Sequence, residues 1–320
     1  MTSVSFLITL YNKSVFLPFV LAGLQAQNGP FTREFIFVDD GSTDNTVAEL
    51  RRLTADWHDP VIILQQANAG PAVAFNNGLA HATGELLKPV DGDDVLTPWA
   101  TAALYEAMKR HGAQVAFGLN HQDGYSPAGT VTPEALLAGL VDNGAASEAR
   151  PDAFMRSLRR SNSNPTCWLA ETDLVRRAGG CDPAVFIQDY SIELRLMYLA
   201  RAAAYTPRPI FIAPAVAAGR LSDNEAQILH DINMAMAGFL EAYPDLPRRY
   251  RRLAFRRCFG RAWAWARRHN GQRSLSREHL RYMRALLPWH GLTPDQLRES
   301  TAVFRVNRAV RIPKPKPSAE

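Results

Sequence analysis

Two short acidic clusters each follow an apolar run of the sequence. The first, Asp39-Asp-Gly-Ser-Thr-Asp44, follows residues 34–38, and the second, Asp91-Gly-Asp-Asp94, follows residues 85–90. Carboxylates gathered in this way can accept hydrogen bonds from a ligand, hold a hard cation or take up a proton during a reaction. These clusters are therefore the residues most able to carry chemistry, provided that the fold brings them together.

Apolar runs alternate with stretches of helical spacing over the first hundred residues. We expect strands over residues 4–11, 34–38, 61–64 and 85–90, separated by helices over 14–27, 43–56 and 71–83. This alternation is typical of a parallel sheet with helices on both faces. Ligands of such sheets bind beyond the carboxyl ends of the strands, so both acidic clusters are expected to face one crevice.

The acidic clusters belong to a longer ordered set of motifs. In chain order these are Thr9-Leu-Tyr11-Asn12, the first acidic cluster, Asn68-Ala-Gly70 with Ala74-Phe-Asn76, Gly84-Glu85, the second acidic cluster and the segment from Gly179 to Arg195. The set resembles family 2 glycosyltransferases, closely over residues 1–100 and again over 179–195. The resemblance implies an α/β, Rossmann-like A-type glycosyltransferase fold with a mixed, mainly parallel central sheet.

The resemblance also implies a reaction. Such an enzyme moves one sugar from a nucleotide-diphosphate sugar, here expected to be a UDP-sugar, to a hydroxyl of a glycan or lipid-linked acceptor. We place it in bacterial surface polysaccharide or glycolipid synthesis. The Gln-X-X-Arg-Trp signature of processive polymerases is absent, so transfer of a single sugar is expected.

The donor nucleotide has candidate ligands at the ends of the first two strands. By resemblance, its base and ribose are bound by Thr9, Tyr11, Asp39 and Asp40. A carboxylate can accept a hydrogen bond from a uracil ring N–H, and a tyrosine face can stack on the base. The other candidates for nucleotide-sugar binding are Leu10, Asn12, Gly41, Ser42, Asn76, Lys88, Asp91 and Gly92. The alternative is that the first cluster is an ordinary turn and helix N-cap.

The second cluster matches the Asp-X-Asp signature of the family, in which a divalent cation is held by carboxylate and by the donor phosphates. We expect Asp93 to be the main ligand of Mn²⁺ or Mg²⁺, with Asp91 and Asp94 as further ligands. The alternative is a solvated turn. Lys88, just before the cluster, is interpreted either as a phosphate contact or as a surface lysine.

A base for the acceptor hydroxyl is expected from the segment Ile187-Gln-Asp189-Tyr-Ser-Ile-Glu-Leu-Arg195. By resemblance Asp189 is the catalytic base, and direct displacement then inverts the anomeric carbon. The alternatives are that Asp189 caps a helix or that Glu193 is the base. Further candidate contacts to acceptor or diphosphate are Trp168, Gln188, Arg220 and His230, although a structural role is favoured for His230.

The length of 320 residues and the 47% hydrophobic content suit one catalytic domain with an appended region. We expect a catalytic domain over 1–240, with a nucleotide-sugar-binding half over 1–100 and an acceptor half over 101–240. A helical basic region over 241–312 and a flexible tail over 313–320 follow. No secretory signal or membrane-spanning run is found, so a cytoplasmic location is expected.

The basic charge is concentrated at the C-terminus. Residues 245–320 hold 19 Lys and Arg against 5 Asp and Glu, or +14, which leaves −9 for residues 1–244 of a chain with net charge +5. Beyond about residue 248, helical spacing predicts an amphipathic basic helix. Its arginines either face solvent on a packed helix or attach the protein to the inner face of the cytoplasmic membrane.

Two other functional classes compete with an enzyme. One is a catalytically inactive scaffold that binds nucleotide sugars, which the intact Asp40, Asp93 and Asp189 disfavour. The other is a nucleic-acid-binding protein in which the C-terminal arginines, with Trp263 and Trp265, contact phosphates and bases. No nucleic-acid-binding module is recognised in the sequence, so no nucleic-acid partner is expected.

Overall fold

The chain was analysed as a computed structural model that describes residues 1–121, 123–159, 164–215, 224–287, 291–306 and 308–312. It divides into two compact units. The sheet unit comprises Met1–Ala153, Ser163–Cys181 and Leu196–Ala217, and the helical unit comprises Phe154–Asn162, Asp182–Arg195 and Ala218–Glu320. This division differs from the predicted boundary at residue 240, because α9 (Glu225–Ala242) packs with the C-terminal helices.

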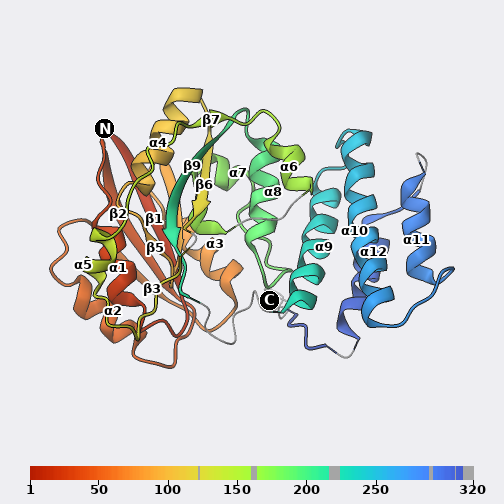
Figure 1. The fold of residues 1–320 in the computed structure, drawn as a ribbon, viewed down its shortest axis with the longest axis horizontal. Helices are drawn as coiled ribbons and strands as arrows, with labels where there is room; N and C mark the ends of the chain where they lie inside the picture. The colour runs from red at the N-terminus through yellow and green to blue at the C-terminus, as the bar shows by residue number, and fades with distance from the viewer. Residues whose placement is uncertain (122, 160–163, 216–223, 288–290, 307, 313–320) are drawn as a thin grey trace, which may run out of the picture. The chain divides into compact units, whose positions relative to one another are not determined.

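The sheet unit is built on one mixed sheet (Figure 1). In the described residues the strand order is β3-β2-β1-β4-β8-β6-β9-β5, with β7 paired to β9. The strands are β1 (Thr2–Leu10), β2 (Phe31–Asp39), β3 (Val61–Gln65), β4 (Leu86–Asp91), β5 (Val95–Leu96), β6 (Val115–Asn120), β7 (Glu148–Ala149), β8 (Trp168–Glu171) and β9 (Ala203–Ile212). β3, β2, β1 and β4 run parallel, whereas β8 is antiparallel to both β4 and β6. The predicted mixed, mainly parallel sheet is thus confirmed.

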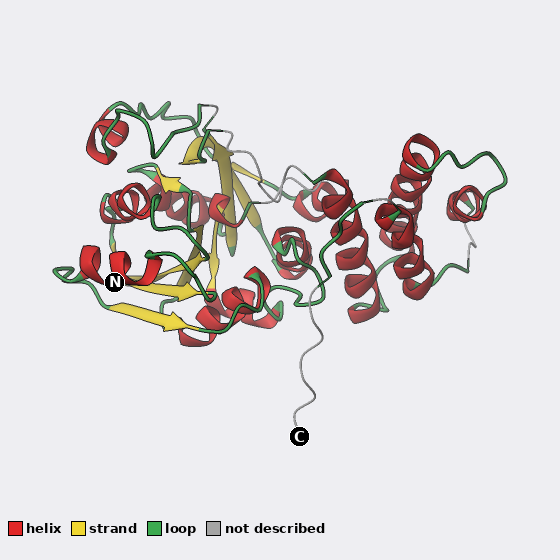
Figure 2. Ribbon diagram, turned by 90° about the horizontal axis from the view of Figure 1, so that it is seen from below, coloured by secondary structure: helices red, strands yellow, loops and turns green. Residues whose placement is uncertain are grey.

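Helices cover both faces of this sheet (Figure 2). They are α1 (Leu17–Gln25), α2 (Thr46–Thr54), α3 (Pro71–His81), α4 (Ala100–His111), α5 (Pro133–Ala138) and α7 (Thr172–Arg177), with the short 3-10 helix η1 (Pro165–Cys167). Because both faces are covered, the central strands carry almost continuous apolar runs. Phe6 of β1 stacks on Phe35 of β2 at 5.1 Å between ring centroids, and Trp57 packs edge-on against Phe35.

The helical unit is formed by α6 (Ala153–Arg159), the first part of α8 (Asp189–Leu199), α9, α10 (Arg248–His269), α11 (Arg277–Leu286), α12 (Pro294–Ser300) and η3 (Thr301–Arg305). The predicted amphipathic basic helix is confirmed as α10. Its apolar side chains, including Phe255, Ala262 and Trp265, are buried against neighbouring helices of the unit. Within the described residues, no helix has both the length and the apolar content needed to cross a bilayer. The predicted tail over 313–320 lies outside the described residues.

The packing of α10 also bears on the nucleic-acid hypothesis. Trp265 is only 2% exposed and packs edge-on against Phe304, and Trp263 lies against the ring of His279 at 4.7 Å between centroids. Trp265 therefore has no exposed face on which a base could stack, and this removes one of the two tryptophans on which that hypothesis depends.

Candidate active site

Three parallel strands end side by side and carry the predicted donor residues. Leu10 pairs with Asp39 across β1 and β2, and Thr9 pairs with Asp91 across β1 and β4. The two acidic clusters therefore flank the end of β1, as their positions after neighbouring strands predicted. We call residues 9–13, 39–44 and 91–94 the strand-end site.

Asp39 has one carboxylate oxygen in use and one without a partner. Its Oδ2 accepts a hydrogen bond from the backbone N–H of Ser42 at 3.1 Å. Its Oδ1 is buried and has no hydrogen-bond partner among the described residues, although the whole side chain is only 2% exposed. Buried acceptors are rarely left unpaired, so this oxygen is available to a donor from a ligand.

Asp40, by contrast, is fully engaged by the protein. Its Oδ1 accepts from Gln66 Nε2 and from the N–H of Ala69, each at 2.8 Å, and its Oδ2 accepts from the N–H of Gly70 at 2.9 Å. Asp40 therefore positions the loop that precedes α3. Its predicted direct contact to the donor remains a prediction.

The residues around Asp39 lock the first two strand ends together. Asn12 has a φ of 52°, and its Oδ1 accepts from the N–H of Thr43 at 2.8 Å. The N–H of Asn12 donates in turn to Ser42 Oγ at 2.8 Å. Gly41 adopts a φ of 76°, where a side chain would be strained. These contacts hold the turn that follows β2 in place.

The two residues before Asn12 have opposite environments. Tyr11 is 47% exposed at the rim of the strand-end site, so its ring is accessible for stacking. Leu10 is 1% exposed and belongs to the core of the sheet unit. The Leu10 side chain is apolar and packed in the core, so the predicted nucleotide-sugar role of this residue would fall to its backbone.

The carboxylates of the second cluster have different partners. Asp93 Oδ2 accepts from Lys13 Nζ at 2.5 Å, and both side chains are about one quarter exposed, at 25% and 26%. Asp94 is 3% exposed, and its Oδ2 accepts from Thr166 Oγ1 at 2.7 Å and from Asn164 Nδ2 at 3.1 Å. Asp93 is thus the accessible member of the cluster, and Asp94 anchors it to the segment before β8.

Two carboxylates of the second cluster have raised pKa values, mainly because they are buried. Burial raises the pKa of Asp91 to about 7, and the charge of Asp93 adds to this effect against Lys13 and Lys88. Burial, followed by the charges of Asp91 and Asp93, also raises the pKa of Asp94. A divalent cation would relieve this repulsion, and carboxylate oxygens are the ligands that Mg²⁺ and Mn²⁺ prefer.

The described residues do not by themselves assemble a complete cation site. Among the described residues, no group of three or more His, Cys, Asp or Glu side chains could hold a metal ion. Asp94 Oδ2 already accepts hydrogen bonds from Thr166 and Asn164. The roles of Asp93 as main ligand and of Asp91 and Asp94 as further ligands stay predictions.

Lys88 is buried beneath the second cluster. The side chain is 0% exposed, which excludes a surface lysine. Its Nζ donates to the carbonyl of Thr166 at 2.5 Å and to that of Pro89 at 3.1 Å, not toward solvent. Burial lowers the pKa of Lys88 to about 7, although the neighbouring carboxylates oppose this shift. We conclude that Lys88 ties β4 to the segment before β8.

Two further candidates hold the backbone of the sheet unit. Asn76 Nδ2 donates to the carbonyl of Cys181 at 2.9 Å, and its Oδ1 accepts from the N–H of the same residue at 2.8 Å. Trp168 is 2% exposed and lies 6.5 Å from the ring of Phe75. Asn76 thus supports the turn at Cys181, whereas Trp168 Nε1 is buried without a hydrogen-bond partner among the described residues, and the ligand roles of both stay predictions. Gly92 lets β1 approach, since a Cβ there would lie 2.7 Å from the carbonyl oxygen of Thr9.

The proposed base and its neighbours lie in the helical unit. Asp189 is half-buried in the first turn of α8, and Gln188 is 4% exposed with a buried Oε1 that has no partner among the described residues. Asp231 Oδ2 accepts from the N–H groups of Phe186 and Ile187 at 3.1 and 2.8 Å, and so holds the segment before Asp189. His230 Nδ1 lies 2.7 Å from Asp231 Oδ1, in agreement with the structural role favoured for it. Arg220 lies outside the described residues.

A family model described as glycosyl transferase family 2 matches residues 5–167, which is half of the chain. This chain belongs to glycosyltransferase family 2. An uncharacterized glycosyltransferase of Nostoc sp. is 35% identical over 106 residues, which cover 33% of each chain. A poly-β-1,6-N-acetyl-D-glucosamine synthase of Staphylococcus epidermidis is 32% identical over 108 residues, or 34% of this chain and 26% of that protein. The chain thus spans about a third or less of the length of these relatives.

Solved structures of other glycosyltransferases share the fold. S. aureus TarS 1–349 in complex with UDP-GlcNAc superimposes with a TM-score of 0.64 and 16% identity, covering 97% of this chain and 93% of that one. The mannosyltransferase PcManGT of Pyrobaculum calidifontis, in complex with GDP-Man and Mn²⁺, gives 0.56 and 17%, covering 94% and 84%. At this identity the likeness establishes the fold alone, and it confirms the expected A-type architecture.

Sequence reasoning missed two residues of this family 2 site. Lys13 forms the ion pair with Asp93, and Thr166 bridges the second cluster by accepting from the N–H of Asp91 at 3.0 Å while donating to Asp94. A signal for Lys13 was present, since a cation follows the Thr9–Asn12 motif directly. Nothing in the sequence pointed to Thr166, because it lies more than 70 residues from the cluster that it contacts.

Proposed function

We propose that this family 2 member moves one sugar from a UDP-sugar to a hydroxyl of a glycan or lipid-linked acceptor. The observation that carries the proposal is the buried Asp39 Oδ1, which lacks a partner among the described residues at the edge where three strands end. A uracil ring N–H would supply the missing donor, and the exposed Tyr11, which directly follows the Leu10 that pairs with Asp39, would stack on the base. UDP-GlcNAc in the TarS structure and the polysaccharide synthase among the relatives support this choice.

The second cluster would hold the divalent cation, Mn²⁺ or Mg²⁺, through Asp93 with help from Asp91. The fit rests on the grouping of three carboxylates at the end of β4, with Asp93 the most accessible, and on their oxygen-only chemistry. When bound, the cation offsets the negative charge that develops on the departing diphosphate. Thr166 and Lys88 keep the end of β4 in position, because both tie it to the segment before β8.

Asp189 acts as the general base in this proposal. It accepts the proton of the acceptor hydroxyl while that oxygen forms a bond to the anomeric carbon and the bond to the diphosphate oxygen breaks. One displacement of this kind inverts the anomeric carbon. Asp231 contributes as a positioning residue, since it fixes the backbone of the two residues that precede Gln188.

The acceptor suggests where the protein works. We place the protein in the cytoplasm. Because lipid-linked acceptors are found at membranes, we further propose peripheral attachment to the inner face of the membrane through the C-terminal region. The exposed arginines of α10 are suited to anionic headgroups.

Isothermal titration of UDP and GDP, with Mn²⁺ and with EDTA, tests the donor site. In Asp39→Asn the remaining oxygen would accept from Ser42, so the amide NH₂ would face the base N–H. We expect UDP affinity to fall about 10- to 100-fold, since a hydrogen bond to a charged group contributes about 1.5–3 kcal/mol. Asp56→Asn, at an exposed position away from the site, is the matched control. Unchanged UDP affinity in Asp39→Asn would refute the assignment.

An inactive scaffold makes a different prediction for the same protein. It would bind UDP in the presence of Mn²⁺ but would release no UDP from any UDP-sugar in the presence of sugar and lipid acceptors. Turnover that is lost in Asp189→Asn excludes the scaffold.

A further inference from the structure

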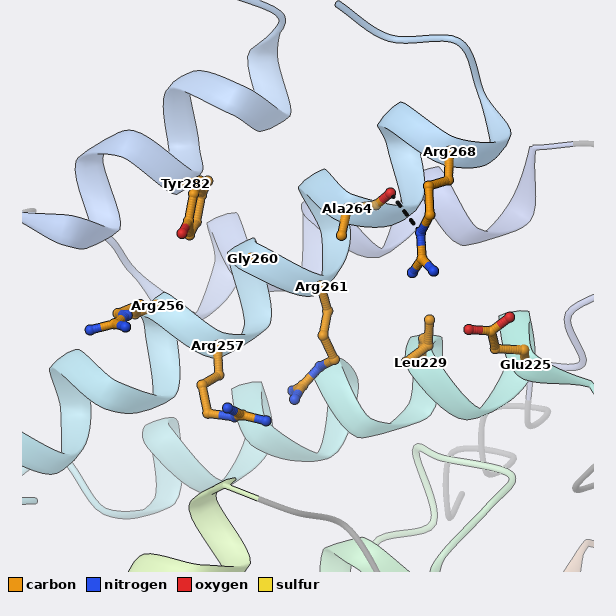
Figure 3. A pocket seen from close by; sticks show the side chains of 9 residues that line it. All are labelled: Glu225, Leu229, Arg256, Arg257, Gly260, Arg261, Ala264, Arg268 and Tyr282. Carbon is orange, nitrogen blue, oxygen red and sulfur yellow. Dashed lines mark hydrogen bonds between the residues drawn. The ribbon is translucent and has the colours of Figure 1, made fainter. Parts of the chain in front are cut away.

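The helical unit contains a cavity that the proposed donor and base residues do not use. Its volume is about 340 Å³, and it is lined from α9, α10 and α11 by Arg256, Arg257, Arg261, Arg268, Tyr282 and Glu225, among others (Figure 3). We call it the arginine pocket. Its volume lies in the range of small-ligand sites, which is about 300–1,000 Å³.

The arginines reach the pocket because of helical spacing. Arg257, Arg261, Ala264 and Arg268 follow one another at intervals of four, three and four residues, and so share one face of α10. Figure 3 shows Arg257, Arg261 and Arg268 extending from α10 toward α9. Gly260 allows α11 to approach, because a Cβ there would lie 3.3 Å from the ring of Tyr282.

These guanidinium groups differ from other arginines of the same unit in their partners. Arg281 pairs with Glu278 and Glu299, and Arg298 pairs with Glu241 and Asp295. No ion pair between described residues involves any of the four arginines of the pocket. Arg261 is held by Asn233 Oδ1 at 3.1 Å and by Cys258 Sγ, both uncharged contacts. One carboxylate, Glu225, lines the pocket against four positive groups.

The positive charges also repel each other. Partial burial lowers the pKa of Arg257, and the charges of Arg261 and of Arg159 on α6 lower it further. A bound anion would relieve this repulsion. Guanidinium groups present a planar pair of N–H donors that matches two phosphate oxygens, and Tyr282 adds a hydroxyl at the wall of the pocket.

We infer that the arginine pocket binds a phosphate-bearing anion with at least two negative charges, of the kind found in a diphosphate ester. An anion with one charge would leave most of the four guanidinium groups unbalanced. The same chemistry is offered by a lipid diphosphate headgroup and by a soluble diphosphate. Neither source depends on the donor site, since the pocket lies entirely within the helical unit.

The first test is calorimetric titration of the full chain with inorganic diphosphate in EDTA, which suppresses cation-dependent binding at the strand-end site. The variant Arg257→Gln/Arg268→Gln removes two charges of the pocket. Among the described residues, neither side chain forms a hydrogen bond to another helix. The control Arg267→Gln/Arg305→Gln removes two exposed charges that do not line the pocket. We expect the pocket variant to weaken binding at least tenfold and the control to change it less than twofold.

The second test distinguishes the sources of the diphosphate. Sedimentation is measured with phosphatidylcholine vesicles that carry either a polyprenyl diphosphate or an equal charge of phosphatidylglycerol. Selective binding to the diphosphate vesicles, competed by inorganic diphosphate, identifies a headgroup site. Binding of soluble diphosphate without vesicle selectivity identifies a soluble ligand.

Three results would overturn the inference. One is absence of diphosphate binding by the folded wild-type chain. Another is equal weakening in the pocket and control variants, which would reveal only a diffuse basic surface. The third is binding of RNA that is stronger than binding of diphosphate and is lost equally in both variants.

Discussion

The strand-end site and the arginine pocket are both charged, but they are built in different ways. In the strand-end site several carboxylate oxygens accept hydrogen bonds from distant parts of the chain, such as Asp40 from the loop before α3 and Asp94 from Thr166. In the arginine pocket one helix supplies four cations, and no carboxylate of the described residues forms an ion pair with them. The first site is organised by the sheet, the second by helical periodicity.

This difference indicates which ligands each region can take. In the proposed function the strand-end site holds the donor diphosphate through a cation, because the charged side chains of its second cluster are carboxylates. The arginine pocket has excess positive charge and needs none. Binding that depends on Mn²⁺ should therefore belong to the sheet unit, and binding in EDTA to the helical unit.

The largest expected effect separates chemistry from binding. Asp189→Asn removes the proposed base from the helical unit, so UDP release from a UDP-sugar should fall by about 10²–10⁴, the usual contribution of general base catalysis. UDP affinity in Mn²⁺ should stay unchanged, because the donor residues lie in the sheet unit. Asp245→Asn, an exposed residue of the helical unit, is the control. Activity retained in Asp189→Asn would direct attention to Glu193.

The next effect separates the two anion sites. Asp93→Ala should weaken UDP binding in Mn²⁺ by about 100-fold, as expected when a charged ligand of a divalent cation is lost. Diphosphate binding in EDTA should be unaffected. Calorimetry of both ligands on the same preparation measures the two effects. Loss of both together would mean that the arginine pocket is not an independent site.

Lys88 makes the stability of the chain depend on pH. Its pKa in the folded chain is about 7, below its ordinary value, so between pH 7 and 9 the unfolded chain binds more protons at this residue. The free energy of unfolding should therefore rise with pH by about 2 kcal/mol from this group over that interval. Urea unfolding in EDTA at pH 7, 8 and 9 measures the rise, and Lys88→Met should abolish it. An identical slope in the variant would show that Lys88 stays charged when folded.

The smallest effect concerns the bridge between β4 and the segment before β8. Thr166→Val removes the hydroxyl that serves Asp94 and the N–H of Asp91, which should cost about 1–3 kcal/mol of folding free energy. Thr166→Ser keeps the hydroxyl and is the control. Denaturant unfolding of the three proteins compares them. If valine and serine are equally stable, the bridge does not support the cluster.

The sequence alone predicted the family, the parallel strands and the basic helix. These features follow from local information. Apolar runs, helical spacing and motifs at strand ends are short patterns, and each predicts the structure of the segment that contains it. The same locality explains why Asp39, Tyr11 and Asp93 can be chosen as donor-site candidates from the sequence. Each lies at the end of a strand or within two residues of it, and the carboxyl ends of parallel strands meet at one edge of the sheet.

Only the tertiary structure decided which side chains are available to a ligand. Asp40 looks equivalent to Asp39 in the sequence, yet the loop before α3 donates to both oxygens of Asp40, whereas Asp39 Oδ1 has no partner among the described residues. Burial likewise showed that Lys88 is an internal support and not a surface lysine. The arginine pocket needed three helices to enclose it. Availability depends on the partners that folding supplies, and those partners are distant in the chain.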